Sequence, residues 1–152
     1  ANIGGSRNSF FGYSAGAATI EGSGNSYFGA KAGLANIAGN DNAFFGNSAG
    51  ALTTGSNNSY FGSAAGRITQ YGVNNTYIGR GAGEYISHGR ENTIIGVEAG
   101  QAYSNGSNYA RDNAFFGYQA GFNTRTTDQT GAESSSNIFI GTRSGFSNET
   151  GD

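Results

Sequence analysis

Bulky hydrophobic residues recur along the chain in short clusters separated by polar, glycine-rich links. In each cluster an asparagine is followed two and three places later by bulky apolar residues, and then by Gly-x-x-Ala-Gly, with Ser144 replacing the last alanine. Successive copies start 17, 17, 16, 17, 17, 21 and 24 residues apart, a period typical of repeat proteins whose coils stack. Counted as position one of each copy, the leading asparagines are Asn8, Asn25, Asn42, Asn58, Asn75, Asn92, Asn113 and Asn137.

The period favours short strands over helices. Each copy carries two glycines, which cost about 1 kcal/mol each inside a helix, and no segment sustains helical spacing. Seventeen extended residues trace about 56 Å, enough for two short strands and two turns. We therefore predict an all-β repeat solenoid, or β-roll, of about eight 17-residue coils. Residues 1–152 form one repeat domain, with regular coils over 8–100 and looser coils interrupted by insertions at 101–112 and 122–136.

Position four is apolar in every copy, which predicts that it fills the coil core. Neighbouring residues of a strand face opposite sides, so position three is predicted to face outward. The predicted core residues are Phe11, Phe28, Phe45, Phe61, Ile78, Ile95, Phe116 and Ile140.

Position three is equally bulky but holds tyrosine in three copies. Eight such residues facing water would form a large apolar patch, so we predict that they form an oligomer interface. The predicted interface residues are Phe10, Tyr27, Phe44, Tyr60, Tyr77, Ile94, Phe115 and Phe139. The stacked asparagines of position one are predicted to bond each coil to the next, as amide ladders do.

Charge and composition exclude several classes of function. The net charge is −2, and one lysine among seven scattered arginines leaves no basic stripe for nucleic acid. The absence of cysteine excludes disulfides and thiolate metal sites. No apolar run approaches the roughly 20 residues of a membrane-spanning helix, so no membrane insertion is predicted. We predict no cofactor and no bound metal.

The residue types that catalyse reactions have simpler interpretations in this chain. The single histidine, His88, lies in a link beside Ser87 and Glu91, and we interpret it as a solvated turn residue. A Ser–His–carboxylate triad remains the alternative, although triads depend on spatial geometry. Arginines interleave with the nearby carboxylates, which predicts surface ion pairs instead of a hydrolase pair. These residues are Arg80, Glu84, Arg90, Glu91 and Glu98. No catalytic residue is predicted, and the chain is predicted not to be an enzyme.

The insertion at 101–112 carries the candidate ligand-binding residues. Insertions in solenoids form loops on one face, which is often the binding face. Rings, amides and a guanidinium of this kind suit contact with a glycan. The candidates are Tyr103, Asn105, Asn108, Tyr109 and Arg111, and an ordinary tolerated insertion is the alternative.

The motif itself resembles known fibre repeats. The runs Asn25–Gly33 (NSYFGAKAG) and Asn113–Gly121 (NAFFGYQAG) resemble the N-T-x-x-G-Y-Q-A-G repeats of phage-type tail-fibre proteins. They resemble, more loosely, the head repeats of YadA-like trimeric autotransporter adhesins, which place smaller aliphatic residues where this chain has Phe or Tyr. The resemblance spans Asn8 to about Gly145. It implies a parallel homotrimer outside the cell, on a cell surface or on a virion tail, used for attachment to a surface glycan or receptor.

Three alternatives remain open from the sequence. A self-polymerising extracellular β-filament would form if coils of different copies stacked end to end. A fibre-borne glycan hydrolase would need an acid/base pair. An ice-binding surface would need a regular row, whereas position two reads Ser, Ser, Ala, Ser, Thr, Thr, Ala and Ile.

Overall fold

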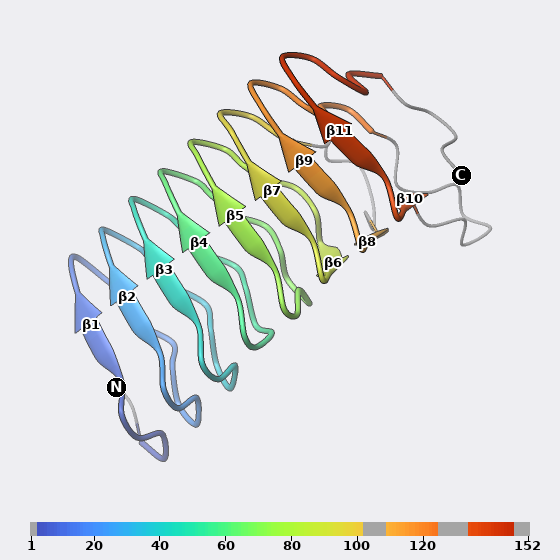
Figure 1. Ribbon diagram of the computed structural model, residues 1–152. Coiled ribbons are helices and arrows are strands. Elements are labelled where there is room, and N and C mark those ends of the chain that lie inside the picture. Colours follow the sequence, from blue (N-terminus) through green and yellow to red (C-terminus); the bar gives the residue numbers. More distant parts are fainter. Residues whose placement is uncertain (1–2, 102–108, 125–133, 148–152) are drawn as a thin grey trace.

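The computed structural model describes residues 3–101, 109–124 and 134–147, which form a β-solenoid without a helix. Eight strands align as one parallel sheet in the order β1-β2-β3-β4-β5-β7-β9-β11 (Figure 1). They are β1 (Ser9–Phe11), β2 (Ser26–Phe28), β3 (Ala43–Phe45), β4 (Ser59–Phe61), β5 (Thr76–Ile78), β7 (Thr93–Ile95), β9 (Ala114–Phe116) and β11 (Ile138–Ile140). The structure shows about 6 turns, so the all-β solenoid is confirmed and the expected count of eight coils is not.

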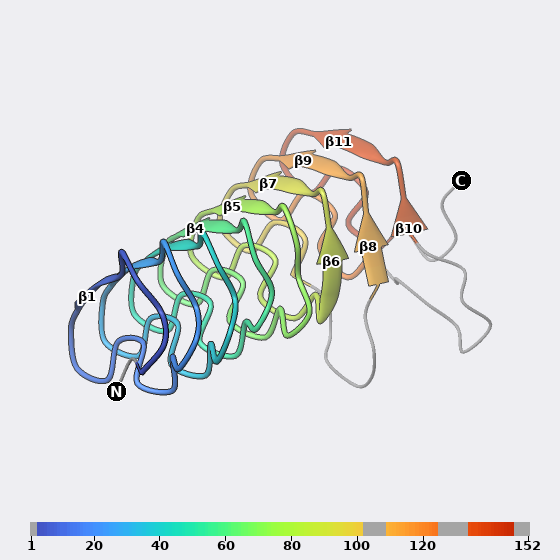
Figure 2. The same ribbon diagram turned by 90° about the horizontal axis from the view of Figure 1, so that it is seen from below.

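A second, smaller sheet lies on another side of the coil, near the C-terminal end (Figure 2). Its parallel strands are β6 (His88–Arg90), β8 (Tyr109–Arg111) and β10 (Ser134–Ser135), in the order β10-β8-β6. Among the described coils, a second strand occurs only in these three. The prediction of two strands per coil therefore holds for the C-terminal part of the solenoid.

Equivalent residues of successive coils lie directly above one another. Between β2 and β3, for example, Tyr27 pairs with Phe44 and Phe28 with Phe45. The position-three rings stack with centroids 4.8 to 4.9 Å apart from Phe10 through Tyr77. This distance matches the spacing of neighbouring strands, so one repeat of the sequence advances the chain by one strand.

The side of the strand that faces the core is opposite to the one we predicted. Position three lies inside, where Tyr27, Phe44, Tyr60, Tyr77 and Ile94 are 0% exposed. Phe115 is 2% exposed, and Phe10 and Phe139 pack partly buried against the same cluster. Burial within one protomer prevents position three from forming an oligomer interface. The predicted interface residues Phe10, Tyr27, Phe44, Tyr60, Tyr77, Ile94, Phe115 and Phe139 are therefore core residues.

Position four, predicted to be the core, faces outward. Exposure is 73% for Phe11, 71% for Ile140, 41% for Phe28, and 40% for Phe61 and Ile78. The remaining members of the column are half-buried. The predicted core residues Phe11, Phe28, Phe45, Phe61, Ile78, Ile95, Phe116 and Ile140 thus form an outer column.

The small residues at positions eight and nine explain why position three is the inner one. Gly33 has φ +57, and a Cβ added there would lie 2.4 Å from the Tyr27 ring. Ala32, beside it, is fully buried. The same contact between the ninth-position glycine and the third-position side chain recurs from Gly16 to Gly145. The corner is therefore kept small because a large ring of its own coil lies beneath it.

The asparagines of position one form the predicted ladder between coils. Asn58 donates from its backbone N–H and its Nδ2 to Asn42 Oδ1, at 2.9 and 3.1 Å, and Nδ2 also donates to the Gly72 carbonyl at 2.8 Å. Its Oδ1 accepts from the backbone N–H and Nδ2 of Asn75, at 3.1 and 3.0 Å. Asn58 is fully buried, so these bonds replace water for its side-chain amide and its backbone N–H.

Asn58→Ala is expected to lower the free energy of unfolding by about 3 kcal/mol. The substitution leaves the Asn75 N–H and the Gly72 carbonyl buried without these partners, and each loss costs 1 to 3 kcal/mol. Chemical denaturation measures the change. Asn47→Ala is the control, because Asn47 is exposed and its side-chain Oδ1 accepts a hydrogen bond from its neighbour Ser48, not from another coil. Equal losses in both variants would contradict the ladder's role.

Candidate functional site

Among the described residues, a row of large hydrophobic side chains runs along the outer face of the main sheet. We call its position-four residues the outer apolar column. Phe11, Phe28, Phe45, Phe61, Ile78, Ile95, Phe116 and Ile140 belong to it, one from each strand. Five of its eight members are at least 40% exposed and the other three are half-buried. Exposed apolar rows are uncommon on isolated soluble proteins, which makes this face the candidate interaction surface.

The rings of the outer apolar column present their edges outward. Phe28 and Phe45 stack with centroids 4.9 Å apart and planes 7° apart, and Phe45 and Phe61 stack at 4.9 Å and 6°. Each inner ring of this run has both faces covered by its neighbours. A flat ligand such as a sugar ring therefore meets edges, not open aromatic faces. The geometry favours a close-packed protein partner over a stacked glycan on this face.

A row of small side chains runs beside the column. Position two shares the outer face with position four and holds Ser26, Ala43, Ser59, Thr76 and Thr93 in the central strands, all half-buried. The outer face thus combines a ridge of large residues with a parallel strip of small ones.

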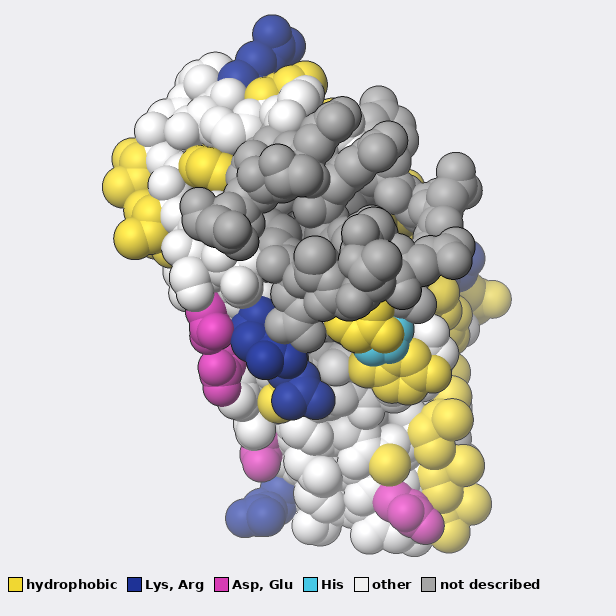
Figure 3. Space-filling model, turned by 90° about the vertical axis from the view of Figure 1, so that its right-hand side faces the viewer, with side chains coloured by type: hydrophobic (Ala, Val, Ile, Leu, Met, Phe, Trp, Pro, Cys, Tyr) yellow, Lys and Arg dark blue, Asp and Glu magenta, His cyan; other side chains and the backbone are white. Residues whose placement is uncertain are grey.

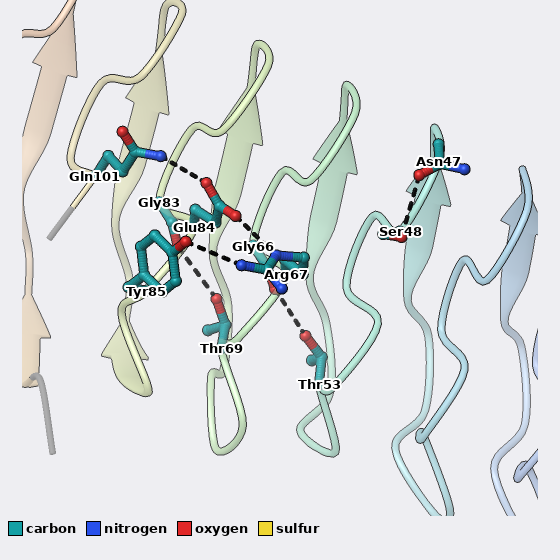
Figure 4. A network of polar contacts seen from close by, with 10 residues as sticks. All are labelled: Asn47, Ser48, Thr53, Gly66, Arg67, Thr69, Gly83, Glu84, Tyr85 and Gln101. Carbon is teal, nitrogen blue, oxygen red and sulfur yellow. Dashed lines mark hydrogen bonds and ion pairs between the residues drawn. The ribbon is translucent and has the colours of Figure 1, made fainter. Parts of the chain in front are cut away.

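Surface ion pairs account for two of the three carboxylates that we considered. Arg67 Nε lies 2.7 Å from Glu84 Oε1, and Gln101 donates to the other oxygen of Glu84 (Figure 4). Arg67 also donates to the Tyr85 hydroxyl at 2.9 Å. These contacts join consecutive coils.

Glu98 forms the second ion pair, with Arg80, as predicted from their interleaving. Hydrogen bonds donated by Gln119 and Arg80 lower the pKa of Glu98 below its ordinary value, and the bond from Gln119 has the larger effect. The predicted surface pairing is therefore confirmed for Glu98 with Arg80. Glu84 is buried, at 8% exposed, and pairs with Arg67, which was not among the predicted partners.

The candidate ligand-binding residues fall in two groups. Tyr103, Asn105 and Asn108 lie outside the described residues. Tyr109 and Arg111 belong to strand β8 and therefore to the solenoid wall. Arg111 is exposed, and Tyr109 is half-buried.

His88 lies in strand β6, which corrects the prediction of a turn residue. Its ring stacks on Tyr109, with centroids 4.4 Å apart, and contacts Tyr71 at 4.9 Å on the other side. Partial burial lowers its pKa. Ser87 Oγ is 3.0 Å from Nδ1, and no carboxylate among the described residues hydrogen-bonds to the ring.

Sequence reasoning missed the partners of Tyr109 and Arg111 in neighbouring coils. The signal was present, because Tyr71, His88 and Tyr109 each lie four residues before the next leading asparagine. Residues at equal offsets stack in a solenoid, so this offset alone places the three rings in one row.

Neither a metal centre nor a membrane span is seen in the part of the chain that the structure describes. Its His, Asp and Glu residues form no group of three or more that could hold a metal ion. It has no helix with the length and hydrophobicity to cross a bilayer. Comparison of the chain with family models, curated proteins and solved structures gave no match.

Proposed function

We propose that this chain is a structural and attachment segment of an extracellular fibre, on a cell surface or a virion tail, built from parallel copies that associate along the outer apolar column. The observation that carries the proposal is the unbroken row of Phe and Ile side chains outside an already complete core. The resemblance of the motif to tail-fibre and trimeric-adhesin repeats supports the same assembly.

Parallel association suits the repeat. Strands in one copy advance by about 4.8 Å per coil, so a parallel neighbour with the same step stays in register along its whole length. Association costs on the order of 4–15 kcal/mol in lost translational and rotational entropy, and the burial of only a few rings between copies would not offset this cost. A column that continues through every strand supplies contacts in each coil.

A homotrimer is the assembly we favour. When the ridge of one copy packs on the small-residue strip of the next, the contact joins two different surfaces, and repeating it about an axis closes a ring. A slender coil with one apolar face fits a threefold axis. A self-polymerising filament is the alternative, in which coils add at β1 or β11 of another copy and growth has no end point.

The double substitution Phe45→Lys/Phe61→Lys is expected to convert a trimer to monomers. Both residues face outward, so the fold should survive, whereas two ammonium groups per copy would be forced into an apolar contact. That cost exceeds about 3 kcal/mol and weakens association at least 100-fold. Sedimentation equilibrium over a range of protein concentrations measures the mass, and circular dichroism checks the fold.

The matched control is Ile37→Lys/Leu52→Lys, which adds the same charges at exposed apolar residues outside the column. We expect the control to keep the wild-type mass. A wild-type chain that stays monomeric, or an equal loss of association in both double variants, would refute assembly through the column. If the mass of the assembly keeps increasing as the protein concentration rises, the filament and not the trimer is the correct assembly.

A further inference from the structure

A row of aromatic rings on the surface of the solenoid ends at Tyr71. His88 has a ring on each side, from Tyr71 in the coil before it and from Tyr109 in the coil after it. Figure 3 shows the histidine in cyan among hydrophobic side chains at the surface. Among the described rings, only that of His88 lies against Tyr71. Tyr71 is 52% exposed, whereas His88 and Tyr109 are half-buried, so the side of Tyr71 that faces the preceding coil has no ring against it.

The row ends there because the preceding coil is one residue short. Its interval, from Asn42 to Asn58, is the single 16-residue one. In each of these coils a residue donates its backbone N–H to the position-nine glycine, and a glycine of the next link stacks on its counterparts. Two residues separate this donor from the link glycine in the neighbouring coils, but only Thr54 does so in the short coil. The donor and glycine pairs are Asn36 and Gly39, Thr53 and Gly55, and Thr69 and Gly72.

Thr54 takes the place beneath Gln70, and the place beneath Tyr71 is skipped. The backbone N–H of Thr54 donates to the Gln70 carbonyl at 2.8 Å, as Ile20 does to the Ile37 carbonyl in an earlier pair of coils. The short coil therefore has no residue left to lie under the Tyr71 ring.

The skipped position has the thickness of one stacked ring. Adjacent coils are about 4.8 Å apart, so the next residue equivalent to Tyr71 is Ala38, about 9.6 Å below it. Ala38 is small and exposed. A ring placed midway would lie about 4.8 Å from the Tyr71 ring. The inner rings of this protein stack at the same spacing, 4.8 to 4.9 Å.

The groups around this position are polar and uncharged. Gln70 is exposed, and its amide can both donate and accept hydrogen bonds. The Thr54 hydroxyl donates to the Gln70 carbonyl at 2.6 Å and can still accept a hydrogen bond. The links of the three coils, 36–40, 53–57 and 69–74, contain no charged residue. An open aromatic face with hydroxyl and amide groups at its rim suits a flat, neutral ligand that carries hydroxyls.

We propose that Tyr71 binds a neutral pyranose unit of a glycan, which occupies the skipped position of the stack. A pyranose with equatorial hydroxyls has apolar C–H faces and a polar edge. One C–H face would pack on the Tyr71 ring while the hydroxyls at the edge bond to Thr54 and Gln70. The rings in the middle of the outer apolar column cannot bind a sugar in this way, because their neighbours cover both faces.

This site lies within a single protomer. The inference rests on the attachment role in the proposed function and does not depend on assembly through the outer apolar column. A failure of sugar binding would leave the sedimentation result unaffected.

The test is saturation-transfer NMR of the full chain with three probes: cellotetraose, chitotetraose and adenosine. Adenosine offers a flat aromatic ring without a pyranose. We expect binding of at least one oligosaccharide and none of adenosine. Tyr71→Ala should weaken binding at least about 10-fold, and Tyr71→Phe should retain it because the ring face remains. Tyr118→Ala removes a ring of similar exposure, 44%, from the turn after β9 and should leave binding unchanged.

A further variant fills the skipped position without removing any residue. A tyrosine inserted between Thr54 and Gly55 restores the 17-residue interval and places a ring beneath Tyr71. We expect this variant to lose sugar binding while its thermal unfolding midpoint, followed by circular dichroism, does not fall.

Several results would overturn the proposal. One is the absence of binding to both oligosaccharides, and another is binding of adenosine as tight as that of the sugars. Equal losses in Tyr71→Ala and Tyr118→Ala, or in Tyr71→Ala and Tyr71→Phe, would show that the Tyr71 ring face is not the contact. A folded insertion variant that binds like the wild type would place the sugar elsewhere.

Discussion

Gly62→Ala is expected to prevent the solenoid from folding, or to lower its free energy of unfolding by at least 4 kcal/mol. Gly62 occupies position five at φ +138, a backbone conformation that residues with a side chain rarely adopt. A Cβ added there would lie 2.5 Å from the carbonyl oxygen of Gly79 in the next coil. Because that neighbour is backbone, it can give way only if the coils separate, which breaks the hydrogen bond from the Gly79 N–H to the Phe61 carbonyl.

The last strand offers a matched control for this prediction. Gly141 is also at position five, with φ +118, but a Cβ added there would meet nothing within 4 Å. Gly141→Ala therefore carries only the backbone strain, on the order of 1–3 kcal/mol. Thermal and chemical unfolding followed by circular dichroism measure both variants. If Gly141→Ala is as damaging as Gly62→Ala, strain alone explains position five, and close stacking of the coils is not the cause.

The repeat period predicted the solenoid because spacing controls stacking. Gly and Asn at fixed offsets leave few backbone paths other than a coil that closes once per repeat. The intervals from Asn8 to Asn92 vary by only one residue, and the paired strands over this range are in register without exception. The period does not indicate whether copies of the chain associate, because the stacking of coils within one chain already explains it.

The choice of inner face failed because hydrophobicity was weighed one position at a time. Position four never carries a polar atom, whereas position three includes Tyr27, Tyr60 and Tyr77, so position four looked like the core. Relations between positions point the other way. The asparagine at position one shares a strand face with position three, and a ladder between coils requires that face to be buried. The small corner at positions eight and nine also requires a large neighbour inside.

The candidate ligand site was only partly accessible from sequence. Tyr109 and Arg111 were identified from their chemistry, but they were assigned to a loop because the interval between copies lengthens there. The structure shows that the link returns to the solenoid as strand β8 before the next asparagine. Pairing with β6 then brings Arg90 opposite Arg111. A lengthened interval therefore does not exclude that some of its residues belong to a strand of the solenoid.

The three buried tyrosines predict a sharp loss of stability in alkali. Tyr27, Tyr60 and Tyr77 are fully buried, and their hydroxyls make no normal hydrogen bond with any described residue. Desolvation raises the pKa of all three above the ordinary value of 10.0. The unfolded chain therefore releases these protons from about pH 10 upward while the folded chain retains them. Stability is complete below pH 10 and falls above it, by roughly 4 kcal/mol per pH unit for three groups.

Replacing all three tyrosines by phenylalanine is expected to move the alkaline unfolding midpoint up by at least about one pH unit. Phenylalanine already occurs in the inner stack of position-three side chains, as Phe44, so the substitution fits the stack and removes only the hydroxyls. The control replaces three exposed tyrosines by phenylalanine and should leave the alkaline unfolding midpoint unchanged. These are Tyr13, Tyr71 and Tyr118, which are 76%, 52% and 44% exposed. Circular dichroism and tyrosinate absorbance, followed together, measure it. Ionisation of every tyrosine while the solenoid stays folded would show that the position-three hydroxyls reach water, contrary to the inner face described above.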